Sequence, residues 1–257
     1  MTDDLVLAEC DGDVVTITMN RPSRRNALSL DHLVALLAAF EDAGRSDATG
    51  VILAGNGPAF SSGHDLGSMV GADLPAMREL LWTCTSVVDT MQSIPQVVLA
   101  RVHGIATAAG CQLVAAADLA VAAESARFAA PGGKGGWFCT TPMVAIGRSI
   151  GRKQALELAL TGDEINASTA LRWGLVNRVV ADDELDAAAA ELLARATRGS
   201  AASRAMGKRA LHTQLGMEQG AAYRYAVEVM ASASQLHDAR EGMASFVEKR
   251  PPEWQHR

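Results

Sequence analysis

The stretch at residues 103–120, HGIATAAGCQLVAAADLA, decides the fold. Its first half consists of very small residues, and its second half is an apolar run interrupted by one neutral amide, Gln112. Small residues let a helix pack tightly against a sheet, and they also leave backbone N–H groups accessible to a ligand. The stretch therefore predicts a buried helix that begins near residues 107–110, followed by a buried strand at residues 119–123.

Predicted strands and helices alternate on both sides of this stretch, which indicates an α/β protein. Apolar runs bounded by turn residues predict strands, whereas apolar residues at helical spacing predict helices. The predicted strands are residues 5–8, 14–19, 51–54, 97–102, 119–123 and 176–180, and the predicted helices are residues 30–43, 74–91 and 153–160. The first two strands, joined by DGD, form a hairpin, and the later strands pair mostly in parallel through right-handed crossovers.

Composition excludes several classes of protein. The chain has 257 residues, of which 49% are hydrophobic and only 4% aromatic, so its core packs mainly on Ala, Leu and Val. A net charge of −6 argues against nucleic acid as a partner, because nucleic-acid binding requires a basic surface. The four cysteines contain no CxxC pair, which predicts free thiols, no metal site and a reducing compartment.

The N-terminus and the apolar content bear on location. The sequence begins MTDDLVLAEC, which has no basic segment ahead of an apolar one, and this predicts a cytoplasmic protein. Residues 105–123 are the one membrane-like stretch, but Gln112 and Asp118 interrupt it and alanine is weakly hydrophobic. No membrane insertion is therefore expected.

Two loops that follow predicted strands have the small residues of a ligand site. Residues 55–68, GNGPAFSSGHDLGS, lack the third glycine of a dinucleotide fingerprint and the lysine of a phosphate-binding loop. They offer instead Ser61, Ser62 and Gly63 directly after a strand, while residues 107–110 offer small residues at a helix start. Backbone N–H groups from both loops would stabilise an oxygen that carries negative charge, as an oxyanion hole does. The alternative is that the small residues serve only close packing.

Five segments occur in a recognisable order: RPSRRNALS, GPAFSSGHDL, HGIATAAGCQL, ARFAAP and ALELALTGDEINASTALRWGLVNRVV. Together they resemble the enoyl-CoA hydratase/isomerase (crotonase) superfamily. The resemblance implies a crotonase-like α/β fold of repeated ββα units at residues 1–195 and a helical C-terminal region at residues 196–257 for trimerisation and pocket cover. It also implies a homotrimer or a dimer of trimers, a coenzyme A thioester as substrate or ligand, and neither a further cofactor nor a metal.

The resemblance assigns the oxyanion hole to two backbone N–H groups, those of Ser62 and Ala109. The family often has glycine at the second position, and an alanine with helical φ still presents its N–H. Gly63, His64 and Asp65 are then expected to line the acyl-CoA site together with Ser62.

Other parts of the coenzyme A site follow from the same resemblance. Arg25 and Ala27 stand in the loop where the family holds the nucleotide end of coenzyme A. A guanidinium suits a phosphate, although arginines in an exposed loop are often only solvated. Gly132 and Trp137, in and after a glycine-rich loop, are expected to wall the acyl pocket.

Gln112 and Gly132 stand where hydratases of the family place two glutamates. Syn addition of water to an unsaturated thioester needs one carboxylate to take a proton from water and another to deliver a proton to the α-carbon. An amide does not titrate, and glycine has no side chain. The resemblance implies the label enoyl-CoA hydratase, a lyase of fatty acid metabolism, yet we expect classical hydration to be weak.

His64 and Gln112 are the candidates to replace the missing pair. Histidine titrates near neutral pH, and glutamine is suited to orient a water or bind a ligand, but each has a purely structural alternative. The reaction therefore stays open between isomerisation, thioester hydrolysis and acyl-CoA binding without turnover. A serine peptidase is disfavoured because the small-residue helix start has no serine.

Overall fold

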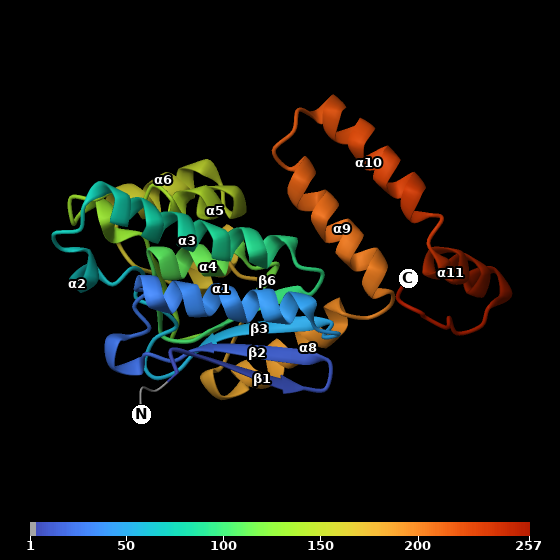
Figure 1. Cartoon of the computed structure of the whole chain (residues 1–257), viewed down its shortest axis with the longest axis horizontal. Coiled ribbons are helices and arrows are strands. Elements are labelled where there is room, and N and C mark those ends of the chain that lie inside the picture. Colours follow the sequence, from blue (N-terminus) through green and yellow to red (C-terminus); the bar gives the residue numbers. More distant parts are fainter. Residues whose placement is uncertain (1–3) are drawn as a thin grey trace.

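A six-stranded sheet forms the centre of the computed structural model, which describes residues 4–257 (Figure 1). Its strand order is β1-β2-β3-β4-β6-β9, with β1 and β2 antiparallel and every other neighbouring pair parallel. The strands are β1 (Val6–Asp11), β2 (Val14–Met19), β3 (Gly50–Gly55), β4 (Val97–Val102), β6 (Leu119–Ala123) and β9 (Arg178–Val180). The predicted hairpin and the predicted parallel pairing are both confirmed.

Helices cover both faces of this sheet. The helices before the C-terminal region are α1 (Leu30–Arg45), α2 (Leu66–Met69), α3 (Leu74–Ser93), α4 (Ala109–Ala116), α5 (Pro142–Ser149), α6 (Arg152–Thr161), α7 (Ala167–Trp173) and α8 (Leu185–Ala196). Alternate residues of β4 face opposite cores: Val98 joins the large cluster with α1, α3 and α4, whereas Leu99 joins the smaller cluster with α8. Burial on both faces explains why the central strands are continuous apolar runs.

A second, three-stranded sheet lies beside the first. It consists of β5 (Ile105–Thr107), β7 (Arg127–Ala129) and β8 (Ile165–Asn166) in the order β5-β7-β8. Sequence reasoning missed all three strands, because two or three residues are too few to show a period. Isolated bridges extend this pairing into the first loop, joining Ser61 to Ala106 and Leu28 to His64.

The predicted boundaries are close to the observed ones, with two exceptions. Residues 14–19, 97–102 and 119–123 coincide with β2, β4 and β6. The strand predicted at residues 5–8 extends to Asp11, and the one predicted at residues 176–180 is restricted to β9. Leu175 and Val176 are instead buried core residues ahead of β9, so their apolar character reflects packing rather than strand pairing.

The last three helices extend away from the sheet (Figure 1). They are α9 (Ala201–Gln214), α10 (Gln219–Ala233) and α11 (His237–Glu248). Lys208 of α9 attaches this region to the core, since its Nζ lies 2.7 Å from Asp118 Oδ2 and donates to the carbonyl oxygens of Met91 and Gln96. Neither α9 nor α10 contains a buried residue.

Candidate active site

Ser61 joins the two small-residue loops. Its N–H donates to the carbonyl of Ile105 at 3.1 Å, and its own carbonyl accepts from the N–H of Thr107 at 3.0 Å. Its hydroxyl donates to the carbonyl of Asn26 at 2.9 Å. Fully buried Ser61 therefore holds the loop after β3 against β5, and the convergence expected of the two loops is observed.

Two glycines allow this close approach. A Cβ on Gly63 would lie 2.8 Å from the Thr107 carbonyl oxygen, 2.9 Å from the Ala108 Cβ and 3.2 Å from the Ala109 nitrogen. A Cβ on Gly110 would lie only 2.4 Å from the carbonyl oxygen of Ser61. Distances below 3.0 Å exclude any larger residue without movement of the backbone, so the small residues here serve contact between the loops.

Helix α4 begins from a strained residue. Ala108 has φ 51° and ψ −117°, a conformation that residues other than glycine rarely adopt. Its N–H donates to the Ala129 carbonyl at 2.9 Å, and its carbonyl accepts from the Gln112 N–H at 3.0 Å. Such strain costs about 1–3 kcal/mol and is concentrated at functional sites. The Ala109 N–H, at the first helical position, has no acceptor within residues 4–257.

The first loop presents a different N–H from the one predicted. The Ser62 N–H donates to the Arg25 carbonyl at 2.9 Å, so it is already bonded and the assignment of Ser62 as a donor is corrected. The bridge between Leu28 and His64 uses the Gly63 carbonyl and the Asp65 N–H. A parallel bridge of this kind directs the His64 N–H away from Leu28. In the described part of the chain the His64 N–H has no acceptor.

A cavity of about 800 Å³ opens beside the two loops. It contains four residues that the sequence singled out: Ser62, His64, Gly132 and Trp137. The ring centroids of His64 and Trp137 are 6.4 Å apart and tilted by 47°. The lining is otherwise Leu66, Leu81, Thr107, Ala108, Pro131, Lys134, Gly135, Phe138, Cys139, Thr140, Thr141 and Pro142. Six predicted residues do not line it: Arg25, Ala27, Gly63, Asp65, Ala109 and Gln112.

His64 is buried and neutral. The residue is only 9% exposed, and both ring nitrogens lack a hydrogen-bond partner within the part of the chain that the structure describes. Burial lowers the pKa of His64 below 6.5; the nearby Leu28 carbonyl, which is outside hydrogen-bonding geometry, opposes this only in part. His64 is therefore not a surface residue.

The two positions that lack glutamates are closed to acid–base chemistry. Gln112 is 4% exposed, and its Oε1 accepts from the Cys84 thiol at 4.0 Å. A Cβ on Gly132 would lie 2.2 Å from the Trp137 carbonyl oxygen and 2.7 Å from Cys139 Sγ. The Gly132 N–H also donates to that sulfur at 3.3 Å. Atoms of the loop therefore occupy the space that a side chain at position 132 would need.

Asp65 supports the first loop. Its Oδ2 lies 3.1 Å from the Arg21 guanidinium, and its Oδ1 accepts from the Gly67 N–H at the start of α2. Arg21 also donates to the carbonyl of Ala27, which is itself buried. These contacts give Asp65 and Ala27 a structural role. Arg25 is exposed and has a left-handed backbone with φ 51°.

Sequence reasoning missed Asn26. It is fully buried, and its Nδ2 donates to the carbonyl oxygens of Asn56, Ala59 and Phe60 while its Oδ1 accepts from the Arg21 N–H. Asn26 also has φ 52°, a region in which asparagine is enriched. The signal in the sequence was an asparagine between a turn and a predicted helix, which also fits a simple cap.

Thiols and metals add little to the site. The four cysteines are free, as predicted, and burial raises the pKa of Cys84 and Cys111 to about 12 and that of Cys139 above its usual range. Such thiols are inert as nucleophiles. Within residues 4–257 no group of three or more His, Cys, Asp or Glu side chains is placed to hold a metal ion, and no helix is both long and apolar enough to cross a membrane.

The family model for enoyl-CoA hydratase/isomerase matches residues 9–257, which include both loops, the cavity and the C-terminal helices. The chain belongs to the enoyl-CoA hydratase/isomerase family. It is 41% identical over 254 residues to enoyl-CoA hydratase domain-containing protein 3, mitochondrial, of Danio rerio, covering 97% of this chain and 87% of that protein. The motifs FSSGHDL, ATAAGCQL and FCTTP resemble this subgroup, and the overall identity confirms that resemblance.

Solved structures of the family confirm the crotonase fold. An enoyl-CoA hydratase from Mycobacterium smegmatis superimposes with a TM-score of 0.94 at 44% identity, covering 97% of this chain and 98% of that one. Human enoyl-CoA hydratase domain-containing protein 3 superimposes with a TM-score of 0.91 at 36% identity, covering 97% of this chain and all of that one.

The same comparisons correct one prediction. The Danio rerio relative is mitochondrial by name, and so is the Homo sapiens one, which is 39% identical over 96% of this chain and 82% of that protein. These relatives overturn the cytoplasmic location that we predicted from the acidic N-terminus. The charge of the first residues was therefore an insufficient basis for that prediction.

Proposed function

We propose that this family member binds an acyl-CoA thioester and holds its carbonyl oxygen between the N–H groups of His64 and Ala109. The observation that carries this proposal is that both N–H groups lack an acceptor within residues 4–257, on two loops that are locked together beside an apolar cavity. The start of α4 adds the positive end of its dipole. Such an arrangement stabilises an enolate or a tetrahedral oxyanion, and one donor is worth roughly 3–4 kcal/mol in the transition state.

Classical hydration is expected to be weak in this proposal. Gln112 does not line the cavity, and the loop around Gly132 occupies the space of a side chain there. No carboxylate pair is therefore available to add water across a double bond. Turnover of crotonyl-CoA in the ordinary enzyme range of roughly 1–1,000 per second would contradict this expectation.

A binding comparison tests the carbonyl site directly. The affinity of butyryl-CoA is compared with that of S-butyl-CoA, a thioether that lacks the carbonyl oxygen, by calorimetry. Two hydrogen bonds of about 1 kcal/mol each predict at least a tenfold preference for the thioester. Equal affinities would refute the oxyanion hole, and no binding of either would refute the proposed function.

The nucleotide end of coenzyme A belongs, in this proposal, at the exposed loop of Arg24 and Arg25. Their guanidinium groups are suited to bind phosphate. Ala27 in the same loop is buried and has only a structural role. The double variant Arg24→Met/Arg25→Met should weaken binding of free coenzyme A and leave the thioester preference intact.

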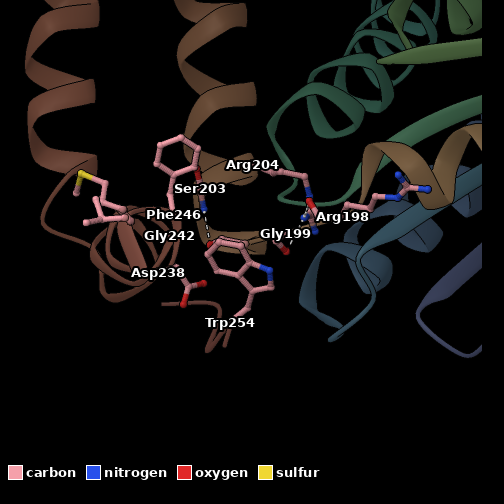
Figure 2. A pocket seen from close by; sticks show the side chains of 12 residues that line it. Arg198, Gly199, Ser203, Arg204, Asp238, Gly242, Phe246 and Trp254 are labelled. Atoms are coloured by element: carbon pink, nitrogen blue, oxygen red, sulfur yellow. Dashed lines mark hydrogen bonds between the residues drawn. The ribbon is translucent and has the colours of Figure 1, made fainter. Parts of the chain in front are cut away.

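The C-terminal helices support assembly as a homotrimer or a dimer of trimers. Tyr223, Met230 and Phe246 are 67%, 78% and 85% exposed, which is unusual for such large side chains. Figure 2 shows Phe246 and Trp254 on an open pocket beside Asp238. Residues 196–257 would then serve oligomerisation and pocket cover, with residues 1–195 as the core. Sedimentation of the purified chain tests the assembly.

A second candidate is acyl-CoA binding without turnover. The closed positions of Gln112 and Gly132 favour it, since they remove the usual acid and base. It predicts a thioester preference in binding but no product from any member of an acyl-CoA panel. Any turnover that depends on the cavity would exclude it.

A further inference from the structure

Two residues that line the cavity carry three polar side-chain atoms that are buried and have no partner in the described part of the chain. These atoms are His64 Nδ1, His64 Nε2 and Thr107 Oγ1, and none has a hydrogen-bond partner within the described residues 4–257. Both residues line the cavity, and His64 is only 9% exposed. Buried polar side chains in folded proteins are nearly always bonded, so a pair of unsatisfied ones in one cavity indicates a polar ligand.

In the sequence, His64 and Thr107 stand at or near the two residues whose N–H groups form the proposed carbonyl site. The His64 imidazole belongs to the residue whose N–H forms one half of the oxyanion hole. Thr107 stands two residues before Ala109, which supplies the other half. One turn further along α4, Gln112 does not line the cavity, and Gly132 has no side chain. The unpartnered polar atoms of the cavity therefore belong to residues that are at or near the two N–H groups of the proposed carbonyl site in the sequence.

We propose that this site hydrolyses the thioester of a bound acyl-CoA, with a water held by the Thr107 hydroxyl and the His64 imidazole. The inference rests on the proposed function, because it needs the carbonyl oxygen between the two N–H groups. Thr107 both donates and accepts, so it orients the water without titrating. Neutral His64 is the general base.

The proposed step is balanced without a further reactant. The water oxygen attacks the carbonyl carbon, its proton passes to His64, and the carbonyl electron pair becomes an oxyanion held by the two N–H groups. Collapse re-forms the carbonyl and breaks the carbon–sulfur bond. The leaving thiolate takes the proton back from the imidazolium, and the products are a carboxylic acid and free coenzyme A.

The surroundings keep His64 in its basic form. Lys134 in the same cavity is paired with Asp163, and the Arg21 guanidinium behind the loop is paired with Asp65. Burial raises the pKa of the Cys139 thiol, which therefore stays uncharged. Burial lowers the pKa of His64, so the imidazole is neutral at pH 7 and gains a proton only at acidic pH.

The experiment measures free coenzyme A released from a panel of saturated acyl-CoAs by a thiol reagent. His64→Gln is expected to lower kcat on the order of 100-fold or more, the usual contribution of a general base, with KM little changed. Thr107→Val should lower kcat about tenfold, as expected when one hydrogen bond to the water is lost. Thr85→Val is the matched control, because its hydroxyl donates to the Leu81 carbonyl within α3.

The outcomes separate this inference from the proposed function. A fall in wild-type kcat at acidic pH that His64→Gln abolishes supports the general base. Wild-type rates in both His64→Gln and Thr107→Val overturn it. Thioester preference in binding without release of coenzyme A overturns hydrolysis and leaves the proposed function standing. Exchange of the α-proton with deuterated water, without release, overturns hydrolysis in favour of chemistry at the α-carbon. Thr107→Val removes an unsatisfied buried hydroxyl and His64→Gln exchanges one neutral polar group for another, so thermal unfolding should show folded proteins.

Discussion

A Cβ on Gly63 would lie 3.2 Å from the backbone nitrogen of Ala109. The two residues follow different strands, and the pairing of Ser61 with Ala106 holds their loops together. Their contact sets the separation of the two loops, and with it the separation of the His64 and Ala109 N–H groups. A site built from backbone N–H groups needs such a constraint, since no side chain can adjust to correct a misplaced loop.

Replacement of Gly63 should therefore affect both stability and binding. Gly63→Ala places a methyl group 2.8 Å from the Thr107 carbonyl oxygen at a residue with φ +81°. We expect a loss of about 2–4 kcal/mol in the free energy of unfolding, from left-handed strain and from overpacking. Affinity for butyryl-CoA should fall at least tenfold, measured by calorimetry.

Gly71→Ala is the matched control for that variant. Gly71 has φ +80°, but nothing lies within 4 Å of its Cβ position. This variant should lose only about 1–2 kcal/mol in the free energy of unfolding, because of its left-handed backbone strain. It should bind butyryl-CoA as the wild type does. If both variants behave alike, the close approach of Gly63 to α4 is not what shapes the site.

Asn26 should be more important for stability than its place in a loop suggests. Asn26→Asp keeps the shape but places a carboxylate against the carbonyl oxygens of Asn56, Ala59 and Phe60. A buried carboxylate whose one backbone donor is the Arg21 N–H, and whose second oxygen faces three carbonyl oxygens, predicts a loss of at least about 3 kcal/mol in urea unfolding at pH 7. The half-buried Asn56, whose Nδ2 donates only to Asn20 Oδ1, provides the control Asn56→Asp, which should lose less than half as much.

The main elements were predictable because each has a local signal. Ser29 caps α1 by accepting from the His32 N–H, and alternate burial in β2 matches its period of two. The choice between Ser62 and His64 had no such signal. Which of the two N–H groups stays free depends on the bridges that the loop forms with Leu28 and Ala106. These bridges are tertiary contacts, which a local sequence pattern does not show. The backbone turn at Gly63 makes simple alternation an unreliable guide.

The closed loop at Gly132 was also beyond sequence reasoning. The glycine showed that a carboxylate is missing, but the loop fold that brings the Trp137 carbonyl against it depends on residues 131–139 as a unit. This has a consequence for attempts to restore hydration. Introducing glutamates at positions 112 and 132 would not rebuild the acid–base pair of a hydratase, because position 132 has no space for a side chain.

Gly132→Glu is accordingly expected to lower the melting temperature. Its Cβ would lie 2.2 Å from the Trp137 carbonyl oxygen, which forces the loop to move. Overpacking of this kind costs about 1–3 kcal/mol. The double variant Gln112→Glu/Gly132→Glu should show no gain in crotonyl-CoA hydration, assayed by loss of the enoyl absorbance. Gly135→Ala, with its nearest neighbour at 3.6 Å, is the control and should melt near the wild type. A gain in hydration would show that the loop opens readily.

Two buried histidines should make stability depend on pH. Burial lowers the pKa of His32, with a smaller contribution from the Arg21 charge and an opposing one from the Ala27 carbonyl, and burial also lowers the pKa of His64. The unfolded chain binds protons at both below pH 6.5, whereas the folded chain does not. Their stability contribution is therefore complete above pH 6.5 and is lost as the pH falls through the folded values.

Unfolding by urea between pH 7.5 and pH 5 isolates this effect. The carboxyl groups of Asp238 and Glu241 have pKa values lowered to about 2. The stability that they contribute to the fold is therefore complete at any pH above the ordinary pKa of a carboxyl group, and it is lost only at more acidic pH. The free energy of unfolding should fall steadily from pH 6.5 to pH 5 in the wild type. The variant His32→Gln/His64→Gln should flatten this dependence, because neither replacement titrates. An equal slope in the double variant would show that other groups set the pH dependence.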